Sequence, residues 1–281
     1  MSLFKRSVIV LLIVLVLPLQ KGWAKTYLIT LATSGLGEKI AQDLANDHHS
    51  IILTGRDQEK LSSVKNKLNQ TSSLSTIQTL SLDFDDPVAV DNAVGTVKRL
   101  LGSSKLDGMV LIGPRPELGK TDSIPNRINW IASIQKVFIE PLVLIQGLKD
   151  KFNNPSSLVI ISGITSKYFI PGYANSNVLR GMWTYETKNL AHQFRSNGIR
   201  VNTISLGFTL TPSNKNRLTQ KAIDSGLSYD EQISLDSASI PSGRHGESSD
   251  VSSLVKYLLS EESSFQNGTD IPLDGGKSPS Y

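Results

Sequence analysis

The 281-residue sequence contains no cysteine, which excludes disulfide bonds, thiol catalysis and cysteine-based metal sites. Histidine is scarce as well, and the four histidines do not have the spacing of metal ligands. We therefore expect no bound metal, and we expect all four imidazoles to lie on the protein surface, as most polar side chains do: His48, His49, His192 and His245.

A strong charge of either sign is also missing. The formal net charge is +4, but three of the cations lie in the first 24 residues, which hold no acid. The remaining chain has a net charge near +1, so it lacks the basic surface expected of a nucleic-acid-binding protein. The sequence has no internal repeat or low-complexity block, and its length fits one α/β domain.

The N-terminus has the pattern of a secretory leader. A basic start is followed by the apolar run VIVLLIVLVLPL (residues 8–19) and by the small residues Gly22 and Ala24. Twelve apolar residues are short of the roughly 20 that span a bilayer as a helix. We expect residues 1–24 to be a Sec-type signal peptide, with export to a periplasm or to the outside and a mature domain over 25–281. The alternative is an uncleaved N-terminal membrane anchor.

After Ala24 the sequence alternates short β-branched runs with longer amphipathic stretches, which is typical of βαβ units around a buried parallel sheet. This alternation predicts an α/β fold with a doubly wound sheet, whose ligands bind at the carboxyl ends of the strands. The seven expected strands are Thr26 to Leu31, Ser50 to Thr54, Ile77 to Leu82, Gly108 to Ile112, Ser157 to Ser162, Arg200 to Ser205 and Thr269 to Leu273.

The loop after the first strand predicts a phosphate site. Its glycines let backbone N–H groups approach a pyrophosphate at the N-terminus of the following helix, although a plain tight turn would use the same residues. The expected cofactor-binding residues of this loop are Thr33, Ser34, Gly35, Leu36 and Gly37.

Arg56 follows the second strand, where an enzyme selective for NAD would carry an acid. A guanidinium at this position suits the 2′-phosphate of NADP, so we expect NADPH rather than NADH as the cofactor. The alternative is an ordinary solvated arginine at the start of a helix.

Four further segments resemble the short-chain dehydrogenase/reductase family, and its ketoacyl-reductase and enoyl-reductase types in particular. IPSGRHGESSD and GTDIPLDGG near the C-terminus resemble the family's "IP-GR-GEPEEIA" and "VDGG". LDFDDPVAV resembles "LDVTDPEAV", which implies that Asp83 and Phe84 lie by the adenine. RVNTISLGFTLTP resembles "RVNAVAPGFIETP", which implies that Gly207 and Thr209 lie by the nicotinamide.

The resemblance covers Lys25 to Lys277 and implies a single-domain Rossmann fold with a seven-stranded parallel sheet. It further implies NADP as cofactor, a small-molecule substrate, and a homo-oligomer, either a dimer or a tetramer. In that assembly the subunits would pair through the helices over 128–151 and 175–197.

The catalytic motif departs from the family pattern. The segment TKNLA fixes the register without a gap, and it puts Arg180 at the position of the family's lysine. Ser176 then stands where the tyrosine belongs, and Gly163 stands where the serine belongs. Leu31 replaces the first glycine of the loop, and Pro114 lies in the segment that replaces the family's "NNAG".

Tyr173 offers a substitute for the missing tyrosine. It precedes Arg180 by seven residues, which is the spacing that the enoyl-reductase branch of the family uses between its tyrosine and lysine. We expect Tyr173 and Arg180 to be the catalytic residues of an atypical NADP-dependent oxidoreductase that acts on a carbonyl or enoyl substrate. The alternative is a non-catalytic member that binds a dinucleotide or acts as a scaffold, with Tyr173 only covering the cleft.

The sequence does not identify the substrate. The segment over 211–239 should form a lid, but it is polar and mixed and shows no charge cluster that would be aimed at a phosphopantetheine or a carboxylate. Either Gln135 or Val137 falls where the family has its active-site asparagine.

We predict that the mature chain begins at Lys25, because an expected strand follows at once and leaves no linker to an anchor. Intact-mass analysis of the protein from its native host tests this prediction. A mass that still includes residues 1–24 would contradict it and favour the uncleaved anchor.

Overall fold

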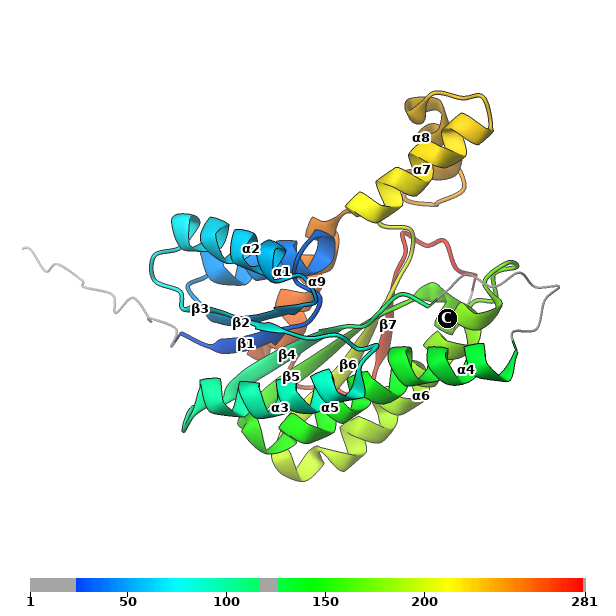
Figure 1. Cartoon of the computed structure of the whole chain (residues 1–281). Coiled ribbons are helices and arrows are strands. Elements are labelled where there is room, and N and C mark those ends of the chain that lie inside the picture. The colour runs from blue at the N-terminus through cyan, green and yellow to red at the C-terminus, as the bar shows by residue number, and fades with distance from the viewer. Residues whose placement is uncertain (1–23, 117–125, 280–281) are drawn as a thin grey trace, which may run out of the picture.

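The computed structural model describes residues 24–116 and 126–279 and is built around one parallel sheet (Figure 1). The strand order is β3-β2-β1-β4-β5-β6-β7, so the predicted doubly wound, seven-stranded parallel sheet is confirmed. The leader predicted over 1–24 lies outside the described residues except for Ala24. The strands are β1 (Thr26–Ile29), β2 (Ser50–Gly55), β3 (Ile77–Ser81), β4 (Leu106–Ile112), β5 (Phe152–Gly163), β6 (Ile199–Leu206) and β7 (Asp270–Leu273).

Helices cover both faces of the sheet (Figure 1). One face carries α1 (Gly35–Asn46), α2 (Gln58–Thr71) and α9 (Ser248–Leu259), and the other carries α3 (Pro87–Leu101), α4 (Arg127–Ile134), α5 (Glu140–Leu148) and α6 (Ala174–Gln193). Each face has its own buried aliphatic core. Two further helices, α7 (Pro212–Asp224) and α8 (Tyr229–Ser237), stand beyond the carboxyl ends of the strands.

The strands form where expected because their aliphatic residues are buried on both faces, as a parallel sheet under two helix layers requires. The largest difference is at β5, which begins at Phe152 rather than Ser157. Phe152 pairs with Leu106 across a register shift, so the strand extends beyond the apolar run that predicts it.

The helical segment from Arg127 to Lys151 contains a π-helical stretch, Gln135–Ile139, between α4 and α5. The backbone carbonyl of Val137, four residues before Pro141, which has no N–H to donate, accepts a hydrogen bond from the Trp183 indole at 3.1 Å. By length and composition, this segment is the one helix among the described residues that could cross a membrane. In the structure it lies along the sheet with α3 and α6 (Figure 1).

Candidate active site

The loop between β1 and α1 builds an N–H-rich helix start. Ser34 caps α1 in an extended conformation, and its side chain makes no capping hydrogen bond. The first backbone N–H groups of α1 are therefore available to an anion. Gly35 has φ +60°, and a Cβ on Gly37 would lie 2.7 Å from the backbone oxygen of Leu31, so both positions need glycine.

Leu31 itself has φ +49°, a left-handed conformation that costs a non-glycine residue free energy. In the family motif, this position is the first glycine of the loop. Here the backbone of Leu31 keeps a conformation that glycine adopts readily, despite its side chain. Thr33 packs against the end of β2, because a Cβ added to Gly55 would lie 2.5 Å from the Thr33 methyl group. The tight turn is therefore built by the conformation of the chain and not by its first glycine.

The residues predicted to hold the adenine side lie on neighbouring loops. Arg56 is exposed at the end of β2, and its Nη1 lies 3.9 Å from a carboxylate oxygen of Asp85. The Asp83 carboxylate accepts a hydrogen bond from the Asp85 N–H at 3.0 Å. Phe84 is only 1% exposed and packs in the core, so only its backbone could contact a ligand.

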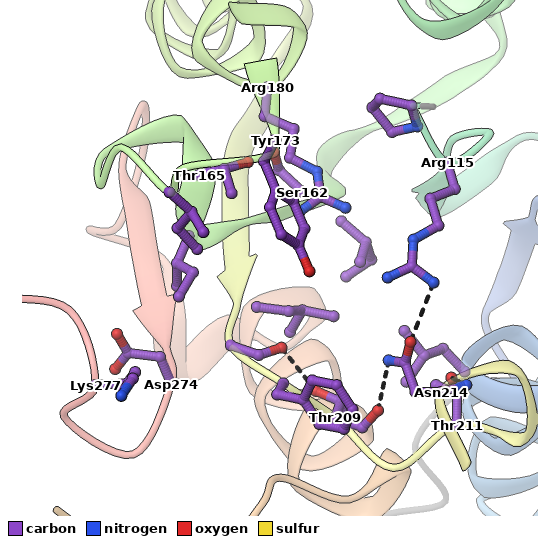
Figure 2. Close-up of a pocket in the computed structure, with 18 of the residues that line it drawn as sticks. Arg115, Ser162, Thr165, Tyr173, Arg180, Thr209, Thr211, Asn214, Asp274 and Lys277 are labelled. Carbon is purple, nitrogen blue, oxygen red and sulfur yellow. Dashed lines mark hydrogen bonds between the residues drawn. The ribbon is translucent and has the colours of Figure 1, made fainter. Parts of the chain in front are cut away.

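A cavity of about 400 Å³ opens beyond the ends of β4, β5 and β6 (Figure 2). Its inner wall is apolar and includes Val137, Ile160 and Trp183. Of the predicted site residues, five line this cavity: Leu36, Tyr173, Arg180, Gly207 and Thr209. The other predicted residues, Thr33, Ser34, Gly35, Gly37, Arg56, Asp83 and Phe84, lie outside its lining.

The phenol of Tyr173 points into this cavity from the start of α6 (Figure 2). Its hydroxyl oxygen accepts a hydrogen bond at 3.2 Å from the guanidinium of Arg217 on α7. Arg180 lies seven residues, about two helical turns, further along the chain in α6 and directs its guanidinium into the same space. The fold thus brings the predicted pair Tyr173 and Arg180 to one cavity. It adds Arg217, which the spacing of that pair in the sequence does not indicate.

Arg180 fills the place of the missing serine. A Cβ built on Gly163 would lie 1.9 Å from Nη1 of Arg180, so any side chain at 163 would have to displace the guanidinium. Ser176, in contrast, is buried outside the cavity, with its hydroxyl 3.3 Å from that of Thr165. The two departures from the family motif, at 163 and 180, are therefore one steric arrangement.

Burial of the Arg180 guanidinium, together with the charge of Arg115, lowers the pKa of Arg180 to about 10. Burial and the neighbouring Arg217 likewise lower the pKa of Arg115. Both groups remain cationic at neutral pH, but in surroundings that disfavour the charged form.

His245, which lines the same cavity, contradicts the prediction that all four histidines lie on the surface. His245 is only 4% exposed, not a surface residue, because its ring packs against Phe208 with ring centroids 4.7 Å apart. Neither ring nitrogen has a hydrogen-bond partner among the described residues. Burial lowers the pKa of His245, so the imidazole is neutral at neutral pH. His49 is half-buried beside Tyr27, whereas His48 and His192 are exposed as expected.

Among the described residues, the cavity gathers arginines from three separate segments, of which only Arg217 belongs to the predicted lid over 211–239. Arg115, in the loop after β4, and Arg217, in the lid helix α7, face the same cavity as Arg180. Asn214 links α7 to the loop after β4, since its side-chain oxygen accepts a hydrogen bond from Arg115 at 3.0 Å. These arginines are far apart in the sequence, so only the folded chain brings them together.

Over residues 24–116 and 126–279, no group of three or more histidine or acidic side chains is arranged to hold a metal ion. The candidate site therefore consists of a helix N-terminus, an apolar cavity and a cluster of arginines around one tyrosine.

Comparison with known proteins shows which family the chain belongs to. The family model described as Enoyl-(Acyl carrier protein) reductase matches residues 31–278. The chain belongs to the short-chain dehydrogenase/reductase family. Membership in this family of oxidoreductases rests on nearly the whole domain and not on one motif.

Two relatives show the breadth of the family. The chain is 26% identical to a 3-oxoacyl-[acyl-carrier-protein] reductase of Rickettsia bellii, over 90% of this chain and 96% of that protein. It is 27% identical to levodione reductase of Leifsonia aquatica, over 94% of this chain and 98% of that protein. At this level of identity, neither relative defines a substrate for this chain.

Solved structures show the same fold. L-sorbose reductase from Gluconobacter frateurii, complexed with NADPH and L-sorbose, has a TM-score of 0.85 at 21% identity, covering 92% of this chain and 98% of that one. A short-chain oxidoreductase from Pseudomonas aeruginosa PAO1, described as containing an atypical catalytic center, has a TM-score of 0.82 at 18% identity, with the same shares covered. The fold therefore extends to proteins with atypical centres.

We predict that positions 163 and 180 are energetically coupled. Gly163→Ser should lower the free energy of unfolding by about 1–3 kcal/mol, because the new side chain collides with the Arg180 guanidinium. In an Arg180→Lys background the same change should cost less, with a coupling of about 0.5–3 kcal/mol. Urea unfolding of the two single variants and the double variant measures this cycle.

Gly95 provides the control, because a Cβ there meets nothing within 4 Å and the residue is exposed on α3. Gly95→Ser should show no coupling to Arg180→Lys. Additive costs for Gly163→Ser and Arg180→Lys would contradict the steric arrangement.

Proposed function

We propose that the protein is an atypical NADP-dependent reductase that acts on a carbonyl or enoyl substrate, with Tyr173 as its proton donor. One observation carries this proposal: the Tyr173 hydroxyl points into the cavity beside Arg180 and accepts a hydrogen bond from Arg217 (Figure 2). Proton donors in such reductions need a cation close to the oxygen that gives up the proton. The chain has no other tyrosine among the residues that line the described cavity.

The residues around α1 fit a dinucleotide. The uncapped helix start at Ser34 and Gly35 suits a pyrophosphate, and exposed Arg56 suits a 2′-phosphate. Gly207 and Thr209, at the other end, line the cavity beside Tyr173. When bound, NADPH would supply the hydride that the substrate carbon receives.

The chain itself would supply the proton and the orientation. Tyr173 would donate its hydroxyl proton to the substrate oxygen or carbon atom, and Arg217 would stabilise the phenolate through the hydrogen bond that it already donates. Arg180 would hold cofactor or substrate hydroxyls, since its fixed fork of N–H donors suits binding better than proton relay. The apolar inner wall would exclude water from the reacting atoms.

The second candidate is a non-catalytic member of the family. It is favoured by the loss of the standard set, since Ser176 is buried outside the cavity and Gly163 has no side chain. The expected export also favours it, because reduced dinucleotide should be scarce outside the cytoplasm. We nevertheless prefer the reductase, because Tyr173 keeps a direct path to the cavity.

We also propose that the chain is exported by its N-terminal leader and that it forms a homo-oligomer. The pattern of residues 1–24 supports the first proposal. Exposed apolar side chains on α4 and α6 support the second, because a monomer gains nothing from leaving them in water: Ile128, Ile131, Val178 and Tyr185. A second copy of this chain would cover them.

We predict that Tyr173→Phe abolishes NADPH oxidation with any ketone or enoyl compound that the native protein reduces. The substitution keeps the ring and its packing but removes the proton, and general-acid catalysis contributes about 10²- to 10⁴-fold. Steady-state assays at 340 nm over a substrate panel measure kcat/KM.

Ser176→Ala is the matched control, because that hydroxyl is buried outside the cavity and should not affect kcat/KM. Reduction that survives Tyr173→Phe would exclude Tyr173 as the proton donor. The non-catalytic candidate would be favoured if the native protein reduces nothing while Gly163→Ser, Ser176→Tyr and Arg180→Lys together create activity.

We predict that Arg56→Ala weakens NADPH binding by about 1.5–3 kcal/mol, the usual value of a hydrogen bond to a charged group, and hardly changes NADH binding. Fluorescence titration with both cofactors measures the two affinities. Arg195→Ala, which removes an exposed arginine at the far end of α6, should change neither. Equal losses for NADPH and NADH would show that Arg56 does not contact the 2′-phosphate.

A further inference from the structure

The cavity carries more positive charge than the proposed reaction requires, since that reaction uses only Arg180 and Arg217. Five lysine and arginine side chains line it, against two aspartates. Three of the cations are arginines from separate elements, namely Arg115 after β4, Arg180 in α6 and Arg217 in α7, and Figure 2 shows Arg115 and Arg180 directed toward the same space.

The two aspartates of the lining are engaged elsewhere. Asp236 forms an ion pair with Lys221 at 2.6 Å. Asp274 accepts hydrogen bonds from the backbone N–H groups of Gly276 and Ser278, at 3.0 and 2.8 Å. Among residues 24–116 and 126–279, no carboxylate lies within 4 Å of the three arginines. Their charge is therefore not neutralised by the described part of the protein.

Among the described residues, the hydrogen bonds of the arginines leave most of their N–H donors without a partner. Arg115 donates to the side-chain oxygen of Asn214 at 3.0 Å, and Arg217 donates to the same oxygen at 3.5 Å and to the Tyr173 hydroxyl at 3.2 Å. Each guanidinium has five N–H donors in a planar fork, an arrangement that matches the oxygens of a carboxylate or phosphate. Partly buried like charges repel each other, and a bound oxyanion would relieve that repulsion.

The phosphates of the dinucleotide are not the anion that these groups best fit. The predicted phosphate contacts lie at the start of α1 and at Arg56, outside the cavity lining. Arg115 and Arg217 instead lie on the loop after β4 and on the lid helix, where both donate to the side-chain oxygen of Asn214 and Arg217 also donates to the Tyr173 hydroxyl. The anion must therefore belong to the molecule that enters the cavity.

We infer that the substrate carries an anionic group, a carboxylate or a phosphate, which Arg115 and Arg217 bind next to the Tyr173 hydroxyl. This inference rests on the proposed function, because it takes the bound molecule to be the substrate of the reductase. The apolar inner wall, with Val137, Ile160 and Trp183, takes the uncharged part of the molecule. The site thus suits a small oxo acid or a phosphorylated ketone.

Calorimetry on the full-length protein without cofactor tests the inference independently of turnover. The carboxylate probe is 4-methyl-2-oxopentanoate against its methyl ester, and the phosphate probe is dihydroxyacetone phosphate against dihydroxyacetone. We expect the charged member of at least one pair to bind tenfold or more tightly than its neutral partner. The pair that shows the difference identifies the anion as carboxylate or phosphate.

Arg115→Gln and Arg217→Gln should each remove most of this difference and should not lower the melting temperature, because each relieves repulsion. Arg217→Lys, which keeps the charge, should retain part of the difference if Arg217→Gln does not fold. Arg195→Gln makes the same change in net charge on an exposed arginine and should leave the difference unchanged.

Equal binding of the charged and neutral members in both pairs would overturn the inference, and so would an equal effect of Arg195→Gln. These outcomes are separate from those of the Tyr173→Phe assay. Selective anion binding without turnover would contradict the reductase and leave the anion site. Equal kcat/KM for acids and their esters would contradict the anion site and leave the reductase.

Discussion

The guanidinium of Arg180 occupies the volume that a side chain at position 163 would need, and the character of the cavity depends on that contact. A serine at 163 with a lysine at 180 would leave a neutral hydroxyl in the wall and a compact charge further back. Glycine at 163 instead lets a planar, permanently charged group reach the reacting space. The cavity is consequently cationic at its centre, where Tyr173 lies beside this arginine and accepts a hydrogen bond from Arg217.

The fold could be read from the sequence because parallel strands buried on both faces leave continuous aliphatic runs. All seven strands fall within the predicted stretches or extend them, as Phe152 does for β5. The pairing of Tyr173 with Arg180 was also predictable, since both lie on one helix at a fixed spacing. These predictions therefore rest on patterns within short stretches of the sequence.

The rest of the site depends on contacts between distant segments. Arg115 and Arg217 are about a hundred residues apart, and neither stands in a recognisable motif. The sequence likewise does not reveal the steric link between positions 163 and 180. In an alignment with the family motif, each position looks like the independent loss of a catalytic residue. His245 was misjudged for a similar reason: its burial depends on Phe208, which approaches only in the folded chain.

The position of Arg217 on α7 has a consequence for access to the cavity. Through this helix the lid holds Tyr173 by one hydrogen bond, and through Asn214 it holds the loop of Arg115 by another. An outward movement of α7 would break both contacts and carry Arg217 out of the site. Opening of the lid and dispersal of the charged centre would then be one event.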